Sequence, residues 1–155
     1  MIGTKFAIGV NSGTDAIKLS LKAIGIGPGD EVITTANTFI ATVGAIGELF
    51  ATPVFVDCTD NFCMDVDQVE DAITPRTKAI VPVHYAGQMT DINDLKEIAD
   101  KHSLPIVEDS CQCILGDING IRSGTTGITG AFSLHPLKNL NVWGDGGVIV
   151  TNDEK

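Results

Sequence analysis

Short apolar runs alternate with segments of helical apolar spacing along the whole chain. The short runs are rich in Val, Ile and Phe and are typical of buried β-strands. We predict strands at residues 6–10, 31–35, 53–57, 78–83, 105–108, 130–134 and 148–151. Turn signals such as the Gly-rich residues 25–30 separate these strands from the helical segments.

Helical segments occupy the intervals between the strands. The first follows Asn11-Ser12-Gly13-Thr14 and carries apolar residues from position 16 to position 24. Further helices are predicted over 38–50 with Thr38 as cap, over 66–73 with Asp65 as cap, and after Thr90 or Asp91. The apolar face of the last helix consists of Ile92, Leu95, Ile98 and Ala99.

This alternation of strands and helices predicts an α/β fold, a mostly parallel sheet with helices on both faces. We assign residues 1–155 to one domain. Ligands of such sheets bind outside the carboxyl ends of the strands. The polar residues at or just after predicted strand ends are Ser12, Asp57, His84, Asp109 and Ser133.

Composition narrows the possible partners. The chain is 43% hydrophobic and 19% charged, as expected of a globular domain, and its formal net charge is −10. That charge argues against nucleic acid or an anionic membrane surface as partner. No basic leader precedes a long apolar segment, and no apolar stretch approaches the roughly 20 residues of a spanning helix. We therefore expect a cytoplasmic protein.

Lys138 is the most informative residue for chemistry. It stands in a stretch from Ala131 to Gly144 that contains no other Lys, Arg, Asp or Glu, five residues after Ser133. A lysine that forms a Schiff base must be held still, partly desolvated and near a phosphate anchor. A solvated surface lysine is the ordinary alternative, which the uncharged surroundings weaken.

Asp109 ends a predicted strand and suits the protonated ring nitrogen of pyridoxal 5'-phosphate (PLP). Gln112, three residues later, is placed to hydrogen-bond the phenolic oxygen of that ring. Capping of the loop after the strand is an equally good explanation of Asp109 taken alone. Glu108 alternates to the other side of the strand, and we interpret it as structural.

The helix start at Ser12, Gly13 and Thr14 offers backbone N–H groups and a positive dipole end to a phosphate. Taken alone, an ordinary Ser or Thr cap is the commoner meaning of this sequence. Ser133 is a further phosphate ligand by its position before Lys138. Phe39 follows a strand end and is a candidate to stack on the cofactor ring, although Phe more often packs in a core.

Other polar residues leave alternatives open. His84 either lines the site or is a polar strand end, and His135 has no assigned role. The spacings of the cysteines, Cys58, Cys63, Cys111 and Cys113, do not match common zinc sites, so we predict reduced thiols and no metal. Residues 144–147, Gly-Asp-Gly-Gly, precede a strand and are better interpreted as a turn than as a nucleotide loop.

The order and spacing of these motifs resemble the DegT/DnrJ/EryC1/StrS family of fold-type I PLP enzymes over nearly the whole chain. The matching segments are 12–16 (SGTDA), 25–33 (GIGPGDEVI), 53–57 (PVFVD), 73–80 (ITPRTKAI), 83–84 (VH), 87–88 (GQ), 108–112 (EDSCQ), 132–140 (FSLHPLKNL) and 144–147 (GDGG). The resemblance implies that Lys138 is the Schiff-base lysine and proton shuttle. It also implies that Asp109 and Gln112 hold the ring, that Gly13, Thr14 and Ser133 bind phosphate, and that Phe39 covers the ring.

The resemblance further implies the reaction. A family member transfers an amino group from glutamate or glutamine to a nucleotide-linked keto sugar, in polysaccharide, lipopolysaccharide or antibiotic-sugar biosynthesis. Members are longer homodimers, so we expect this chain to be the central part of the large domain, without the N-terminal segment and the C-terminal domain. The alternatives are a PLP- or PMP-dependent sugar dehydratase, which the family builds with His in place of Lys138, and a non-catalytic regulatory protein.

Overall fold

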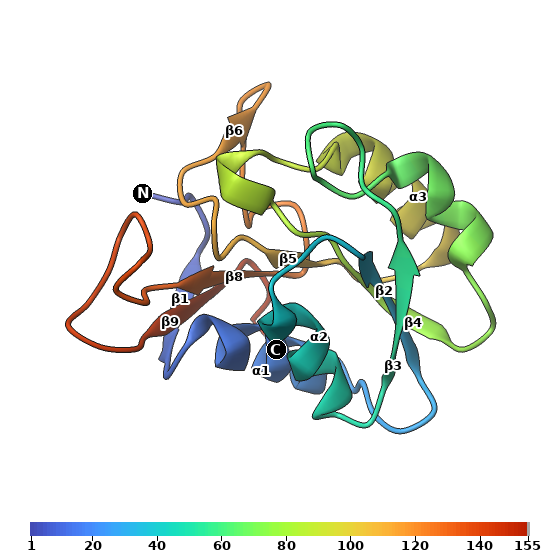
Figure 1. Cartoon of the computed structure of the whole chain (residues 1–155), viewed down its shortest axis with the longest axis horizontal. Helices are drawn as coiled ribbons and strands as arrows, with labels where there is room; N and C mark the ends of the chain where they lie inside the picture. Colours follow the sequence, from blue (N-terminus) through green and yellow to red (C-terminus); the bar gives the residue numbers. More distant parts are fainter. Residues whose placement is uncertain (155) are drawn as a thin grey trace.

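The structure is a computed structural model that describes residues 1–154. Lys155, the last residue of the predicted domain, lies outside the described residues. Figure 1 shows a twisted sheet through the middle of the molecule, with helices on both of its sides. The predicted α/β class is therefore confirmed.

The sheet consists of two hydrogen-bonded groups of strands. In the first, β3 (Thr52–Val56), β2 (Glu31–Thr35) and β4 (Thr77–Val81) are parallel. The second has the order β1 (Phe6–Val10), β9 (Gly147–Thr151), β8 (Thr129–Ser133) and β5 (Val107–Asp109). Parallel bridges from Ile80 to Ile106 and from Val83 to Asp109 join β4 to β5.

The resulting row, β3-β2-β4-β5-β8-β9-β1, is mostly parallel, as predicted. Only β9 among these strands runs against its neighbours, since it pairs antiparallel with both β8 and β1. The reversal follows from the short connection after β8, because residues 134–146 return the chain directly instead of through a crossover helix. This loop contains Lys138.

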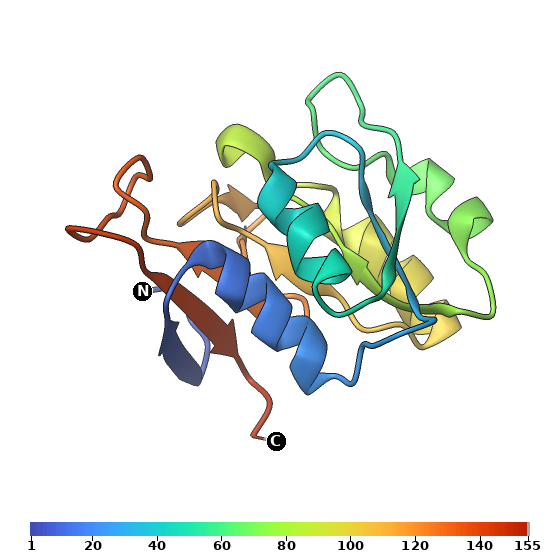
Figure 2. The same cartoon turned by 60° about the horizontal axis from the view of Figure 1, so that its bottom comes forward.

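The alternation of side chains along the strands produces two cores, one on each face of the sheet. In β2, Val32 belongs to the core beneath α1 (Gly13–Ala23) and α2 (Ile40–Gly47), whereas Ile33 belongs to the opposite core with α3 (Ile92–His102). Figure 2 shows α1 and α2 side by side on their face. Burying a side chain such as Leu21 contributes roughly 1.5–3 kcal/mol.

Several predicted helix boundaries are wrong. The segment predicted as a helix over 66–73 forms two 3-10 turns, η1 (Val66–Gln68) and η2 (Glu70–Ala72), although Asp65 does accept the N–H of Asp67 as its cap. The helix predicted over 38–50 starts at Ile40 and ends at Gly47. Its N-cap position is Phe39, and Thr38 does not cap it, because the Thr38 hydroxyl pairs with another side chain.

The hairpin of β6 (Asp117–Ile118) and β7 (Ile121–Arg122) was not predicted. Its turn is Asn119-Gly120, with φ of 54° and 83°. Positive φ at both central residues defines the turn that an Asn-Gly pair favours between two strands. The signal is therefore present in the sequence, but each strand is too short to show a period. A 3-10 turn, η3 (Tyr85–Gly87), follows β4 and was also missed.

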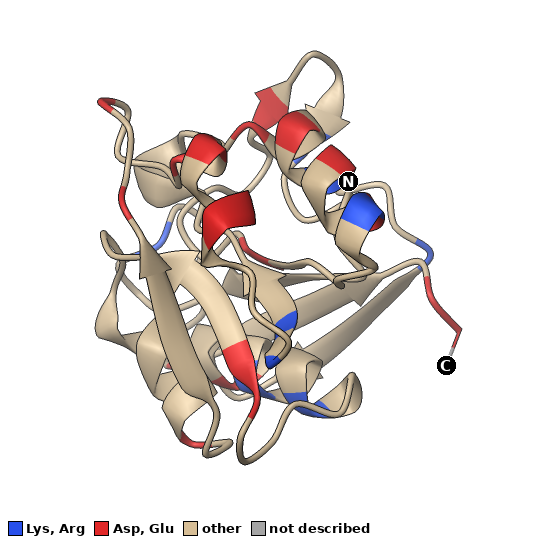
Figure 3. Cartoon of the chain, turned by 90° about the vertical axis from the view of Figure 1, so that its right-hand side faces the viewer, with Lys and Arg blue, Asp and Glu red and all other residues tan. Residues whose placement is uncertain are grey.

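The surface around α3 is acidic. Figure 3 shows acidic segments on several turns and helices of the side of the molecule that faces the viewer. The acidic residues of this region include Asp65, Asp67, Asp91 and Asp94. None of the helices within residues 1–154 is long and apolar enough to cross a membrane.

Candidate active site

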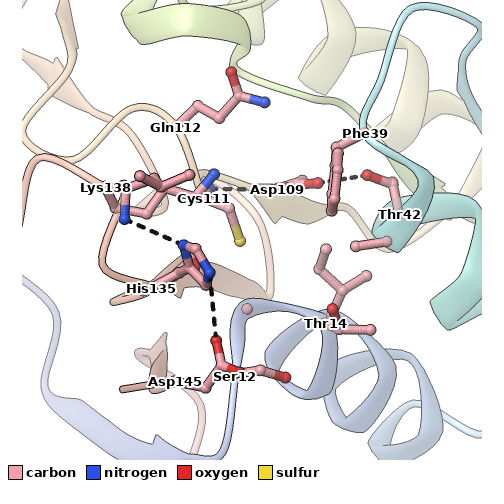
Figure 4. Close-up of a pocket in the computed structure, with 15 residues that line it drawn as sticks. Ser12, Thr14, Phe39, Thr42, Asp109, Cys111, Gln112, His135, Lys138 and Asp145 are labelled. Carbon is pink, nitrogen blue, oxygen red and sulfur yellow. Dashed lines mark hydrogen bonds and ion pairs between the residues drawn. The ribbon is translucent and has the colours of Figure 1, made fainter. Parts of the chain in front are cut away.

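A cavity of about 440 Å³ opens at the carboxyl ends of the parallel strands β5 and β8. Its walls come from the starts of α1 and α2, the end of β5, the end of β8 and the loop that leads to β9. All the predicted site residues line it: Ser12, Gly13, Thr14, Phe39, Asp109, Gln112, Ser133 and Lys138. Figure 4 shows those of them that it labels, Ser12, Thr14, Phe39, Asp109, Gln112 and Lys138, around one space. The volume lies within the range of small-molecule and cofactor pockets.

Asp109 is the buried carboxylate of this cavity, with only 5% of its surface exposed. Its Oδ2 accepts a hydrogen bond of 2.7 Å from the Thr42 hydroxyl, and its Oδ1 accepts one of 3.1 Å from the Cys111 N–H. Both bonds are drawn in Figure 4. An ionised carboxylate can accept about four hydrogen bonds, so acceptor capacity is left over for a ligand in the cavity.

Thr42 is a site residue that the sequence analysis missed. It lies in the first turn of α2, is fully buried and lines the cavity. Nothing in the local sequence distinguishes it from the small residues around it, because its partner, Asp109, is 67 positions away. Cys111, His135, Leu137 and Asp145 line the cavity as well and were not predicted to do so.

The start of α1 forms the anion-binding end of the cavity. Ser12 is the N-cap, and its hydroxyl oxygen accepts the N–H of Asp15 at 3.0 Å. The N–H groups of Gly13 and Thr14 have no acceptor within residues 1–154. Unpaired N–H groups at the positive end of an eleven-residue helix suit a phosphate. Ser12 thus acts as a cap and lines the cavity as well.

Gly13 is required by packing. A Cβ at this position would lie 2.7 Å from both the Cys111 Sγ and the Ser133 Cβ. A Cβ on Gly147 would likewise lie 2.2 Å from the backbone oxygen of Ser12. Two glycines therefore let α1 approach β8 and β9 closely enough to place its N–H groups in the cavity.

Lys138 lies at the end of a tight turn after β8. Its N–H bonds the backbone oxygen of His135 at 2.8 Å, and the Leu137 N–H bonds the Nδ1 atom of the same histidine at 3.2 Å. The Lys138 side chain is half-buried, and its ammonium group has no partner among the described residues. Among residues 1–154, it is the only Lys or Arg that lines the cavity.

Two further groups are oriented toward a ligand. The Gln112 Oε1 accepts the N–H of Ala86 at 3.1 Å, so its amide NH₂ remains available as a donor. The Ser133 hydroxyl oxygen accepts the N–H of His135 at 3.3 Å and keeps its own proton to donate. Phe39 is 64% exposed and stands at the rim of the cavity, so it is not a core residue.

Cys111 is an unreactive thiol in this setting. Burial raises its pKa well above the usual value, the negative charge of Asp109 raises it further, and the positive charge of Lys138 lowers it only in part. A thiol held protonated is a poor nucleophile. Cys111 therefore contributes shape to the cavity wall.

His84 does not line the cavity. It is fully buried on the other face of the sheet, where its Nε2 lies 2.8 Å from the Glu108 Oε2 and its Nδ1 accepts the N–H of Thr90 at 3.2 Å. Because Nδ1 is an acceptor, the ring proton is on Nε2 and is donated to Glu108. Of the two interpretations of His84, the structural one is correct.

The cysteines form no disulfide and no metal cluster within residues 1–154. All four of them are free thiols. The described residues also contain no group of three or more His, Cys, Asp or Glu side chains arranged to hold a metal ion. Cys63 and Cys113 are buried in the protein, and burial raises the pKa of each.

The sheet order and this cavity define an α/β domain of the fold-type I PLP-dependent transferase class. The model of the DegT/DnrJ/EryC1/StrS aminotransferase family matches residues 1–155. The chain therefore belongs to this family, as its motifs indicated.

Individual relatives agree with that assignment. The chain is 49% identical over 154 residues to the dTDP-3-amino-3,4,6-trideoxy-alpha-D-glucose transaminase of Micromonospora megalomicea, with 99% of this chain and 41% of the relative covered. It is 49% identical over 152 residues to a pleiotropic regulatory protein of Geobacillus stearothermophilus, with 97% and 41% covered. The crystal structure of NtdA from Bacillus subtilis with bound cofactor PMP superposes with a TM-score of 0.92 at 40% identity, covering 99% of this chain and 34% of NtdA. The chain thus spans about two fifths of the length of the curated relatives it matches.

Proposed function

We propose that the whole protein is a PLP-dependent aminotransferase that acts on a nucleotide-linked keto sugar, with glutamate or glutamine as amino donor. The observation that carries this proposal is the convergence of Lys138 and Asp109 on one cavity, from segments 29 positions apart in sequence. A half-buried lysine without an ionic partner is suited to covalent attachment of an aldehyde. A buried carboxylate with free acceptor capacity is suited to a protonated ring nitrogen.

The residues present fit the cofactor from end to end. The free N–H groups of Gly13 and Thr14, with the Ser133 hydroxyl, bind the phosphate. Asp109 holds the ring nitrogen, and the NH₂ group of Gln112 donates to the phenolic oxygen. The ring of Phe39 covers the cavity mouth. The cavity of about 440 Å³ accommodates a group of this size.

PLP, when bound, supplies an electron sink for the substrate carbon that carries the amine. Asp109 would keep the proton on the ring nitrogen of the bound cofactor, because a nearby carboxylate favours the charged ring. The Nζ atom of Lys138 takes up a proton from the substrate carbon and returns it, which requires a flexible amine close to the reacting atoms.

A relative of known substrate supports the substrate class. The Micromonospora relative is a transaminase of a dTDP-linked amino sugar, which favours a nucleotide-linked sugar for this protein. We further propose a homodimer located in the cytoplasm, with the remaining domain of a family-length protein completing the site. Residues 1–155 would then be the PLP-binding part of the large domain.

Lys138 also distinguishes the proposed reaction from its alternatives. Dehydratases of the family carry His at this position, so the lysine favours transamination. The relative from Geobacillus stearothermophilus is a pleiotropic regulatory protein, which is the observation in favour of the regulatory alternative. However, a regulatory scaffold has no need for a lysine, a carboxylate and an anion-binding helix start around one cavity.

The test is titration of the full-length protein with PLP. We expect a visible absorbance band that the Lys138→Ala variant lacks, and a borohydride-reducible link of the cofactor to the wild-type protein. The surface variant Lys96→Ala, which removes an exposed lysine that forms an ion pair with Asp100, is the matched control. A reducible link that persists in Lys138→Ala would refute the assignment. Amino transfer from glutamate or glutamine to keto-sugar nucleotides is then assayed directly.

A further inference from the structure

Two threonine hydroxyls connect the start of α2 to Asp109. The Thr38 and Thr42 Oγ1 atoms lie 2.7 Å apart, and the Thr42 Oγ1 lies 2.7 Å from the Asp109 Oδ2. Thr42 is fully buried, and Thr38 is half-buried. Figure 4 shows Thr42 pointing at Asp109 across the cavity wall. These contacts join a helix and a strand that lie far apart in sequence.

The direction of this chain of hydrogen bonds follows from a count of protons. A threonine hydroxyl has one proton to donate, and an ionised carboxylate can only accept. Thr42 must therefore donate its single proton to the Asp109 Oδ2. Thr38 must in turn be the donor to Thr42. The order is Thr38 to Thr42 to Asp109.

Neither hydroxyl serves the helix in the usual way. The N-cap residue of α2 is Phe39, which makes no side-chain cap bond, and the Thr42 N–H bonds the backbone oxygen of Phe39 at 3.1 Å. Other buried threonines nearby behave differently. Thr34 donates to a backbone oxygen of Val81, and the Thr35 hydroxyl has no partner among the described residues.

We propose that Thr42, supported by Thr38, is a positioning residue for the ring-nitrogen anchor. The bond to Oδ2 fixes the rotation of the Asp109 carboxylate, while the Cys111 N–H fixes Oδ1. The free lone pairs of Asp109 are thereby oriented into the cavity. Because Phe39 lies between the two threonines in sequence, the same bonds hold the turn that presents its aromatic ring. This inference rests on the proposed function.

The experiment measures the dissociation constant of PLP and the position of its visible band in four variants of the full-length protein. Thr42→Val keeps the shape and removes the donor, and we expect the dissociation constant to rise about tenfold or more. Thr42→Ser restores the hydroxyl and should bind within about threefold of wild type. Thr38→Val removes only the second donor and should cost about threefold.

Thr35→Val is the matched control, since it removes a buried hydroxyl that has no partner. It should leave the dissociation constant and the band unchanged. A purely structural role for Thr42 predicts a lower melting temperature with an unchanged band and dissociation constant in the folded fraction. That result, or failure of Thr42→Ser to restore binding, would overturn the inference.

The outcomes separate this inference from the function on which it rests. Wild-type protein that binds PLP through Lys138, together with an unaffected Thr42→Val variant, overturns the positioning role and leaves the function intact. Wild-type protein without the band overturns both. Should Thr42→Val fail to fold, Thr38→Val decides: a wild-type dissociation constant in that variant rejects the connection to Asp109.

Discussion

Glu108 and Asp109 are neighbours in β5, yet their carboxylates lie in opposite kinds of environment. The Glu108 carboxylate accepts hydrogen bonds from the His84 ring and from the backbone N–H groups of Gly124, Thr126 and Gly127. These donors use essentially all of its acceptor capacity. The Asp109 carboxylate, on the other face of the sheet, accepts only the Thr42 hydroxyl and the Cys111 N–H among the described residues.

The difference shows how one strand end serves stability on one face and binding on the other. The fully hydrogen-bonded carboxylate of Glu108 connects β5 to the loop before β8 through Gly124 and to the segment after β4 through His84. A buried charge is tolerated only when it is paired in this way. The Asp109 carboxylate has acceptor capacity left over, and it borders a cavity in which a cationic group can donate the missing hydrogen bond.

The largest expected effect comes from neutralising the Asp109 carboxylate, which has acceptor capacity free for a ligand. Asp109→Asn should reduce transamination by at least about 100-fold, the scale on which a positioned acid–base group contributes. The free energy of unfolding should fall by only about 1 kcal/mol, because the amide oxygen still accepts from Thr42 and only the bond from the Cys111 N–H is lost. Steady-state kinetics and urea unfolding of the same preparation measure the two effects. A variant that is active but unstable would reverse the roles that we assign to the two faces.

Neutralising the Glu108 carboxylate, whose acceptor capacity is fully used, should reduce stability much more than activity. Glu108→Gln places an NH₂ group against backbone donors and weakens the bond to His84. We expect a loss of about 3 kcal/mol in the free energy of unfolding, measured by urea denaturation. The turnover number of the folded protein should fall by less than tenfold. The comparison fails if the cofactor is lost while stability is kept.

Gly13→Ala tests the packing that brings the anion-binding helix start to the cavity. The added Cβ would meet Cys111 and Ser133 at 2.7 Å, so neighbouring groups must move. We expect a loss of roughly 1–3 kcal/mol in stability and weaker binding of PLP. Gly44→Ala, in open space on α2, is the control and should have neither effect. Unchanged PLP affinity in Gly13→Ala would remove Gly13 from the phosphate site.

The smallest effect is a dependence of stability on pH. Burial would raise the pKa of Glu108, but the hydrogen bonds from His84 and the backbone outweigh it and lower that pKa. The Glu108 carboxyl therefore binds a proton more readily in the unfolded state than in the folded state. Its contribution to the free energy of unfolding is fully present above about pH 4.5 and is lost as the pH falls through the lower pKa of the folded state. Unfolding by urea between about pH 3 and pH 6 should show this slope in wild type and a shallower one in Glu108→Gln. Equal slopes of the free energy of unfolding against pH in wild type and Glu108→Gln would show that Glu108 is not the titrating group.

The sequence predicted the parts of the site that belong to local rules. Ser12, Asp109 and Ser133 follow strand ends, and in a parallel sheet such positions meet at one edge. Lys138 was recognisable from its uncharged surroundings and from its spacing to Ser133. These predictions needed only the alternation of elements and the chemistry of each residue type.

The expectations that the structure corrected or decided concern the side-chain partners of polar residues. Thr38 looked like a helix cap, but its hydroxyl is taken by Thr42. His84 could be interpreted in two ways until the position of Glu108, 24 residues later, was known. Local propensity describes the conformations that a residue favours by itself, and it does not predict which side chain the residue contacts in the folded protein.

The amino-acid pattern was therefore sufficient for the α/β class and for the prediction that Lys138 and Asp109 meet near the strand ends, where both line one cavity. Which acceptor sites of Asp109 and Glu108 remain free depended on the packing of α2 and of the loop before β8. A strand's period of two determines that neighbouring carboxylates face opposite sides of the sheet. Contacts between segments far apart in the chain determine which groups pack on each face of the sheet. They therefore also determine which of the two carboxylates remains able to bind a ligand.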